Sequence, residues 1–208
     1  MNFEPSVSYL KQVEKIYASL KADYPGSWQP ITELSRNFAQ HEDFIICNYK
    51  AFNFDKVNNP GTAAGIKEKT PDALFLQNDI FYFVEFKAGK NVSRSAIRQK
   101  IQEGINTLYQ YCVVKKLATR EEFVHFRFKY AVVDKRSDLK GKVSFFNALQ
   151  SSAQHYSLKN LEGLLVEQTR VCSTPQSALK LFEKISRGKI TSITYVEKDG
   201  KRLKMVEG

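Results

Sequence analysis

Residues 70–90 have the sequence TPDALFLQNDIFYFVEFKAGK, and this stretch decides the fold. Two apolar runs flank Asn78-Asp79, a pair that suits a two-residue hairpin turn, although Asn-Gly would suit it better. With the turn centred there, residues whose numbers sum to 157 lie opposite one another, so that Leu74 faces Phe83. Both faces of the ribbon are apolar, which is typical of central strands covered on both sides. We therefore predict a buried hairpin.

Three charged residues lie at one end of the same ribbon. The predicted register places Asp72 directly across from Glu85, and Lys87 shares their face because side chains alternate with a period of two. Opposed carboxylates repel each other, and charges beside an apolar face are costly unless they are paired or bind a metal. A divalent cation would relieve both penalties. The alternative is a cross-strand salt-bridge cluster at the edge of the sheet.

The composition indicates one domain over residues 1–208, with 42% hydrophobic residues and 15 Phe to build a core. Lys plus Arg number 32 against 22 Asp plus Glu, which gives a net charge of +10. Such an excess favours a polyanionic partner, here nucleic acid. The alternative is a basic surface without a particular partner.

Cysteine usage favours a reduced, cytoplasmic (intracellular) setting, because Cys47, Cys112 and Cys172 are far apart and form no CxxC. The N-terminal segment lacks the pattern of a secretory signal, and no apolar run approaches a membrane span. We therefore expect no membrane partner. The sequence contains no Walker A or G-x-S-x-G motif, and its histidines lack metal-ligand spacing.

The whole chain predicts an α/β fold, a central mixed β-sheet with helices packed on both faces. Ser93 is expected to cap a long helix. The apolar stripe of that helix comprises Ile97, Ile101, Ile105, Leu108 and Cys112. Periodicity places helices at about 5–22, 32–41, 93–116, 143–154 and 174–188. Extended segments are placed at about 44–54, 71–87, 126–133, 164–171, 190–196 and 202–206, the last two joined at Asp199-Gly200.

The dipeptide PD at positions 71–72, followed by EFK at positions 85–87, resembles the PD-(D/E)xK motif of the restriction-endonuclease-like nuclease superfamily. The resemblance implies an αβββαβ core, and the predicted element order agrees with it over about residues 30–135. Residues 140–208 fall outside the resemblance and are interpreted as a C-terminal α/β extension.

The resemblance implies a metal site made by Asp72, Glu85 and the carbonyl of Phe86, binding Mg²⁺, with Mn²⁺ able to substitute. Mg²⁺ prefers oxygen ligands and keeps several waters, so two carboxylates leave positions for water and a substrate phosphate. The ion acts as a Lewis acid and lowers the pKa of its water. Lys87 would position the attacking water or stabilise the developing charge, and both roles remain open.

Members of this superfamily often add a carboxylate from the helix before the first strand. Glu33 is the favoured candidate because it lies about ten residues before the strand that begins near Phe44. Glu14, on the first predicted helix, is its rival. An ordinary solvent-facing glutamate is the alternative for both.

The helix after the motif offers candidate nucleic-acid contacts, in which Arg98 is favoured over Arg94 and Gln102, and Lys90 precedes them. At about 100° per residue, Arg94 falls near the middle of the apolar stripe and Arg98 about 60° from it, so both are predicted to lean towards the sheet. The alternative is that they extend from the helix flank into water. Further candidates for contacts with backbone phosphates are Lys67, Lys69 and Lys100.

The combined pattern predicts a Mg²⁺-dependent nuclease that hydrolyses DNA phosphodiester bonds, with RNA as an alternative substrate and a homodimer left open. One rival interpretation is a catalytically inactive nuclease-fold module that binds nucleic acid or a partner protein. The other is an unrelated α/β protein with an ion cluster at the edge of its sheet.

Overall fold

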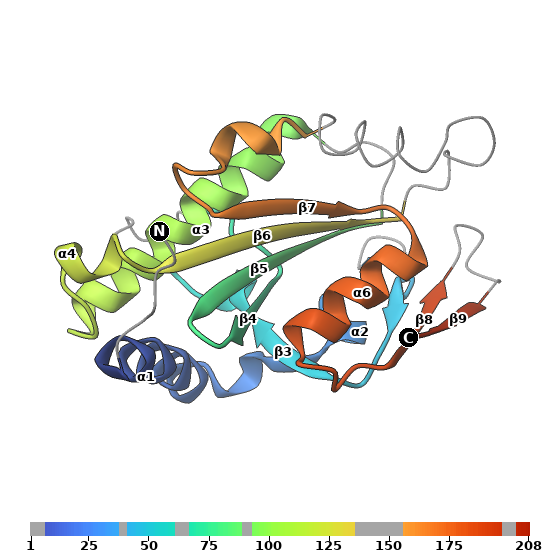
Figure 1. Ribbon diagram of the computed structural model, residues 1–208, viewed down its shortest axis with the longest axis horizontal. Coiled ribbons are helices and arrows are strands. Elements are labelled where there is room, and N and C mark those ends of the chain that lie inside the picture. Colours follow the sequence, from blue (N-terminus) through green and yellow to red (C-terminus); the bar gives the residue numbers. More distant parts are fainter. Residues whose placement is uncertain (1–6, 38–40, 61–66, 89–92, 136–155, 197–202) are drawn as a thin grey trace.

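A mixed β-sheet runs through the centre of the protein (Figure 1). The computed structural model describes residues 7–37, 41–60, 67–88, 93–135, 156–196 and 203–208. Neighbouring strands are antiparallel from β1 to β5 and parallel from β5 to β7, so the predicted mixed sheet is confirmed. Within the described ranges its spatial order is β1 (Trp28–Pro30), β3 (Lys50–Asn53), β4 (Ala73–Gln77), β5 (Ile80–Lys87), β6 (Arg127–Asp134) and β7 (Gln168–Cys172).

The hairpin of β4 and β5 has the predicted register. Leu74 pairs with Phe83 and Gln77 pairs with Ile80, so the turn lies at Asn78 and the residue that follows it. Asn78 has a φ of 57°, a left-handed conformation that asparagine adopts more readily than most residues. Turn chemistry and apolar alternation therefore agree on one pairing.

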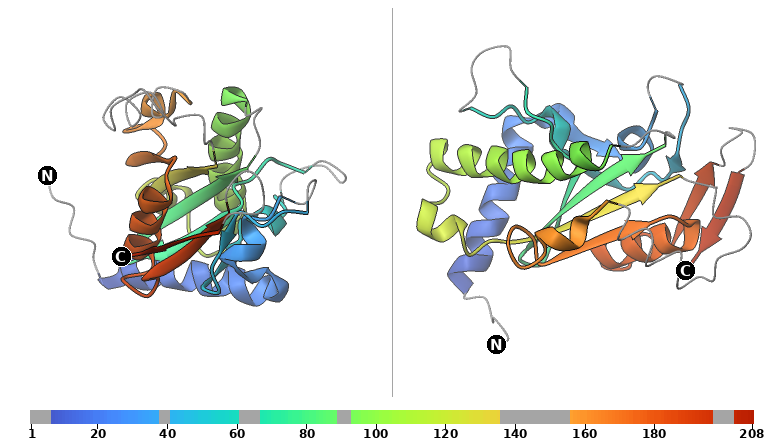
Figure 2. Two further views of the ribbon diagram at one scale, coloured as in Figure 1. Left: turned by 90° about the vertical axis from the view of Figure 1, so that its right-hand side faces the viewer. Right: turned by 90° about the horizontal axis from the view of Figure 1, so that it is seen from above.

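Side chains of this hairpin alternate between two hydrophobic cores on opposite faces of the sheet. Leu74 and Phe83 pack in the core that contains α1 and α3. Phe75 and Val84 pack in the core that contains α2 and α6. Figure 2 shows α3 and α6 on opposite sides of the sheet, as predicted. Within the described ranges the α-helices are α1 (Val7–Asp23), α2 (Ile31–Leu34), α3 (Arg94–Val114), α4 (Arg120–Phe123) and α6 (Pro175–Ile185).

Helix α3 connects the two parallel strands β5 and β6, and it therefore starts near the end of β5. Its N-cap is Ser93, as predicted, because the Ser93 hydroxyl accepts a hydrogen bond from the Ala96 amide at 3.4 Å. Among the helices of the described ranges, none is long and apolar enough to cross a membrane.

The C-terminal segment extends the same sheet and contributes β8 and β9 to a second one. β7 adds a parallel strand beside β6. The second sheet has the order β2 (Ile45–Ile46), β8 (Ser192–Val196) and β9 (Leu203–Glu207), and β8 and β9 form the expected terminal antiparallel pair. The predicted helix at 143–154 and the predicted turn at Asp199-Gly200 lie outside the described residues.

The prediction of a helix over 32–41 is wrong, because α2 ends at Leu34. The Ser35 hydroxyl accepts a hydrogen bond from the Ile45 amide at 3.1 Å and lies 3.3 Å from the Ile45 carbonyl, to which it can donate. These buried contacts tie Ser35 to β2 and replace the helical continuation, in the way that serine side chains commonly compete with helix formation.

The extended segment predicted over 44–54 contains two strands, and these belong to different sheets. β2 pairs with β8 in the small sheet, whereas β3 pairs with β1 and β4 in the central sheet. The strand predicted at 164–171 begins later, at Gln168, because the Leu165 and Val166 amides both donate to the Leu161 carbonyl. These boundaries depend on partners far away in the sequence.

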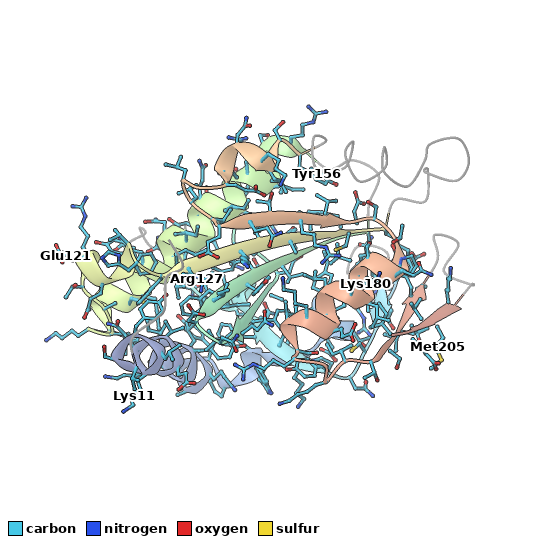
Figure 3. The ribbon with its side chains drawn as sticks, viewed as in Figure 1. Lys11, Glu121, Arg127, Tyr156, Lys180 and Met205 are labelled. Carbon is cyan, nitrogen blue, oxygen red and sulfur yellow. The ribbon has the colours of Figure 1, made fainter. Side chains whose placement is uncertain are left out.

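Ion pairs lie at one end of the central sheet, where β6 begins. Arg127, at the start of β6 and labelled in Figure 3, lies 2.8 Å from the buried Asp79 carboxylate and donates to Glu167 at 3.1 Å. The opposite end, where β5 finishes, holds the charged residues that the sequence singles out.

Candidate metal and phosphodiester site

The site begins where the first strand of the hairpin starts and the second ends. Asp72 directly precedes β4, and Glu85 and Lys87 lie in the last three residues of β5. The Phe86 amide donates a 2.7 Å hydrogen bond to Asp72 Oδ2, which fixes that carboxylate against β5. The Glu85 side chain is completely buried.

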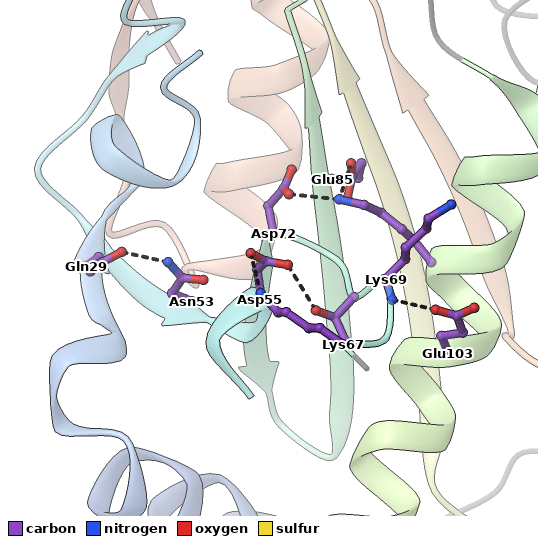
Figure 4. A network of polar contacts seen from close by, with 10 residues as sticks. Gln29, Asn53, Asp55, Lys67, Lys69, Asp72, Glu85 and Glu103 are labelled. Carbon is purple, nitrogen blue, oxygen red and sulfur yellow. Dashed lines mark hydrogen bonds and ion pairs between the residues drawn. The ribbon is translucent and has the colours of Figure 1, made fainter. Parts of the chain in front are cut away.

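Asp72 and Glu85 converge on one position, as the register predicts, and the group at that position is the ammonium of Lys100. Lys100 Nζ lies 3.1 Å from Asp72 Oδ1, 2.8 Å from Glu85 Oε1 and 2.9 Å from Glu85 Oε2. Figure 4 shows the two carboxylates directed towards one another across these contacts. The Lys87 ammonium also contacts Glu85 Oε1. Two carboxylates therefore face two ammonium groups.

Close packing of α3 brings Lys100 to this position. Gly104 follows Lys100 by one helical turn on the same side of α3. A Cβ at Gly104 would lie 2.6 Å from Pro71 Cδ, so only glycine lets the helix approach the residue before Asp72 this closely. One turn further on, the Thr107 hydroxyl and the Asn106 amide both donate to the Glu68 carboxylate. The segment that precedes Asp72 is thus held along the helix.

The sequence predicts Lys100 only as a candidate phosphate contact, because Lys100 lies outside the apolar stripe of α3. That stripe is indeed buried at Ile97, Ile101, Leu108 and Cys112, but the buried face is wider. It also includes Gly104, Thr107 and Tyr111, which continue the helical row that starts at Lys100. A glycine and a threonine in that row are the signal that could have revealed it.

Burial and charge oppose each other at the pair. Burial first, and the Asp72 charge second, raise the pKa of Glu85 to about 7, although Lys100 and Lys87 act in the opposite direction. Burial alone would lower the pKa of Lys100, but the two carboxylates outweigh it and raise that pKa above its ordinary value. Burial and the same carboxylates raise the pKa of the fully buried Tyr130 hydroxyl. Positive charge next to the two carboxylates is therefore strongly stabilised at this site.

A cavity of about 400 Å³ opens beside Asp72, whereas Glu85 lies buried behind its wall. Its wall includes Asp72 and Lys87, together with Glu33 from α2, so the structure brings the predicted Glu33 to the same cavity. Asp55 is a further acidic residue of the wall that the sequence analysis did not single out. It follows β3, whose neighbour across the sheet is the start of β4, and its carboxylate lies 3.1 Å from Lys67 Nζ. Knowledge of that strand pairing would have revealed it.

Among the predicted nucleic-acid contacts that the structure describes, Arg94, Arg98 and Gln102 do not line this cavity. Arg98 donates to the Ser157 carbonyl at 2.8 Å, which ties α3 to the C-terminal segment. Arg94 is exposed and does not lean onto the sheet as predicted, because it lies in the first turn of α3. Gln102 is also exposed, and Lys90 lies outside the described residues. Their predicted role in binding nucleic acid stays a prediction.

The oxygen donors suit a hard divalent ion. Glu85 Oε1 is buried, and within the described part of the chain no group donates a hydrogen bond of normal geometry to it, although the Lys87 and Lys100 ammonium groups lie against it. Among the described residues, no three His, Cys, Asp or Glu side chains gather closely enough to hold a metal ion. Glu33 and Glu14 therefore do not complete a three-carboxylate cluster. A pair of carboxylates completed by water is an arrangement that Mg²⁺ commonly uses.

Comparisons of the chain with protein-family models, with curated proteins and with solved structures give no match.

Proposed function

We propose that the protein is a divalent-metal-dependent nuclease that hydrolyses DNA phosphodiester bonds, with a core of the PD-(D/E)xK kind. The observation that carries this proposal is the convergence of Asp72 and Glu85 on a single cation position. Lys87 lies beside them, and an open cavity adjoins Asp72. Carboxylates presented in this way suit a metal that must also bind water and a phosphate.

Each residue of the pair has a structural reason for its role. Asp72 and Glu85 would hold the metal, and the Phe86 amide keeps Asp72 in place through its 2.7 Å hydrogen bond. When bound, Mg²⁺ supplies Lewis-acid stabilisation of the phosphate and lowers the pKa of its water. Lys87 lines the cavity and its ammonium contacts Glu85, from where it would orient water or stabilise negative charge on the phosphate. The Phe86 carbonyl remains a predicted additional ligand, whereas Glu33 lines the same cavity without joining the pair in a three-carboxylate cluster among the described residues.

The topology supports the same proposal. β3, β4 and β5 form an antiparallel meander, α3 crosses over, and β6 returns parallel to β5. This order agrees with the βββαβ part of the core that the sequence resemblance implies. The net charge of +10 favours a nucleic-acid substrate through neutralisation of phosphates.

A second candidate function is a nucleic-acid-binding module without catalysis. The observation that favours it is the Lys100 ammonium, which neutralises both carboxylates without a metal. The two candidates make different predictions for cleavage but the same prediction for salt-sensitive binding.

Cleavage of supercoiled plasmid and of labelled oligonucleotides with Mg²⁺, Mn²⁺ or a chelator tests the proposal. We expect Asp72→Asn and Lys87→Met each to lower the cleavage rate by about 10²–10³-fold, because each removes a group that acts on the transition state. Binding measured by fluorescence anisotropy should persist in both variants.

Asp23→Asn and Lys115→Met are the matched controls, since they remove the partners of a 2.8 Å ion pair near the opposite end of α3. Both controls should cleave at the wild-type rate. Metal-dependent cleavage that survives in both Asp72→Asn and Lys87→Met would refute the proposed site. Wild-type binding without any cleavage would favour the second candidate.

A further inference from the structure

The Lys100 ammonium has the surroundings of a bound cation. Three carboxylate oxygens from Asp72 and Glu85 lie within 3.1 Å of its nitrogen. A Mg²⁺ ion would be held by the same oxygens at about 2.1 Å. A metal that uses both carboxylates would therefore occupy the space in which the ammonium now lies. A metal ion and an ammonium that share this space would repel each other strongly, because both are positively charged.

Of the three side chains, Lys100 is the one that can move away from the contact. Glu85 is completely buried in β5, and Asp72 is held by the Phe86 amide. Lys100 is 19% exposed and carries its charge on a flexible four-carbon stem, whose backbone belongs to a helix packed against Pro71. Exchange of the cation can therefore take place through movement of one side chain, while the two carboxylates stay where they are.

Lys87 does not have the same position. Its ammonium contacts Glu85, whereas Lys100 bridges both carboxylates. Removal of Lys87 would therefore leave the bridge intact. Lys87 therefore borders the cation position, whereas the Lys100 ammonium occupies it.

We propose that Lys100 is an exchangeable internal cation of this site: its ammonium and a divalent metal ion bind the Asp72 and Glu85 pair in a mutually exclusive manner. Metal binding releases Lys100, and the freed ammonium becomes an additional positive group for a phosphate at the metal. The proposal rests on the metal site of the proposed function but does not require cleavage.

Isothermal titration calorimetry of Mn²⁺ into the full chain tests the exchange without an activity measurement. We expect Lys100→Met to bind Mn²⁺ at least about tenfold more tightly than the wild type, because the competing cation has been removed. Lys69→Met is the matched control, since Lys69 loses one charge beside the same helix but contacts Gln99 rather than the pair. Its Mn²⁺ affinity should stay within about twofold of the wild type.

A measurement on the wild type keeps the proposal testable if Lys100→Met does not fold without metal. Amine acylation followed by peptide mass spectrometry reports the accessibility of each lysine. Mn²⁺ should increase the acylation rate of Lys100 severalfold and leave that of the exposed Lys67 unchanged. Lys100→Gln, which removes the charge but keeps an N–H donor on the side chain, provides the second variant for calorimetry.

The outcomes separate the two proposals. Equal Mn²⁺ affinity in the wild type, Lys100→Met and Lys100→Gln, with no change in Lys100 acylation, would overturn the exchange while leaving the metal site intact. Absence of Mn²⁺ binding in every variant would overturn the metal site and the exchange together. Tighter binding in the two variants, with metal-dependent acylation of Lys100, would support the exchange even if no nucleic acid is cleaved.

Discussion

Gly104→Ala tests the close approach that places Lys100. In a helix interior, alanine is favoured over glycine by about 1 kcal/mol, so helix propensity alone predicts a more stable protein. The structure predicts the opposite, because the new Cβ would lie 2.6 Å from Pro71 Cδ and 3.1 Å from Pro71 Cγ. Normal carbon contacts are about 3.5–4.0 Å, so the helix or the proline must retreat by about 1 Å.

The cost follows from which atoms collide. The proline ring is part of the backbone and cannot rotate away, so the strain spreads into the packed core. Overpacking of this kind costs about 1–3 kcal/mol, and the short contact places Gly104→Ala towards the upper end. After the gain in helix propensity, we expect a net loss of about 1–2 kcal/mol of unfolding free energy.

Equilibrium urea denaturation followed by circular dichroism measures this loss as a lower midpoint with an unchanged m value. Gly26→Ala is the control, because a Cβ at Gly26 would meet no atom within 4 Å. Its stability should equal or slightly exceed that of the wild type. A Gly104→Ala protein as stable as the wild type, or more stable, would refute the close packing of α3 against Pro71.

Three further predictions concern buried groups. Arg127→Met leaves the nearly buried Asp79 carboxylate without its 2.8 Å partner and should lower the free energy of unfolding, measured by urea denaturation, by about 3 kcal/mol. A loss below about 1 kcal/mol would contradict the stabilising role of this ion pair. Tyr130→Phe should be neutral or stabilising by up to about 1 kcal/mol, because the Tyr130 hydroxyl finds no hydrogen-bond partner in the described structure, and a loss above about 2 kcal/mol would indicate a hidden partner. Burial raises the pKa of Cys112 to about 12, so an aromatic disulfide reagent at pH 8 should modify the half-buried Cys47 before the buried Cys112. Rapid labelling of Cys112 in the native protein would contradict its burial.

Local patterns predicted the elements whose partners are close in sequence. The β4–β5 hairpin follows from apolar alternation and the Asn78 turn, and its register alone placed Asp72, Glu85 and Lys87 together. Ser93 and Thr174 were placed correctly at the starts of α3 and α6 because a cap needs only its own helix. Each of these predictions uses contacts within one element or one turn.

Predictions failed where distant segments compete for the same backbone. Ser35 bonds to β2 and ends α2 early, and the residues after Phe44 divide between two sheets because β8 supplies a partner. The same reason explains why Asp55 was missed, since it reaches the cavity only through the pairing of β3 with β4.

Residue order alone determined a hairpin with two carboxylates across one register, because the alternation of side chains along paired strands leaves no other arrangement. Packing in three dimensions decided which cation meets them. The rotation of α3 about its axis and its contact with Pro71 at Gly104 bring the Lys100 ammonium to the two carboxylates, and both depend on packing between segments that are distant along the chain. Lys100 is one of many basic residues in the sequence, and it is the close packing of α3 that brings its ammonium into contact with the buried Glu85 carboxylate.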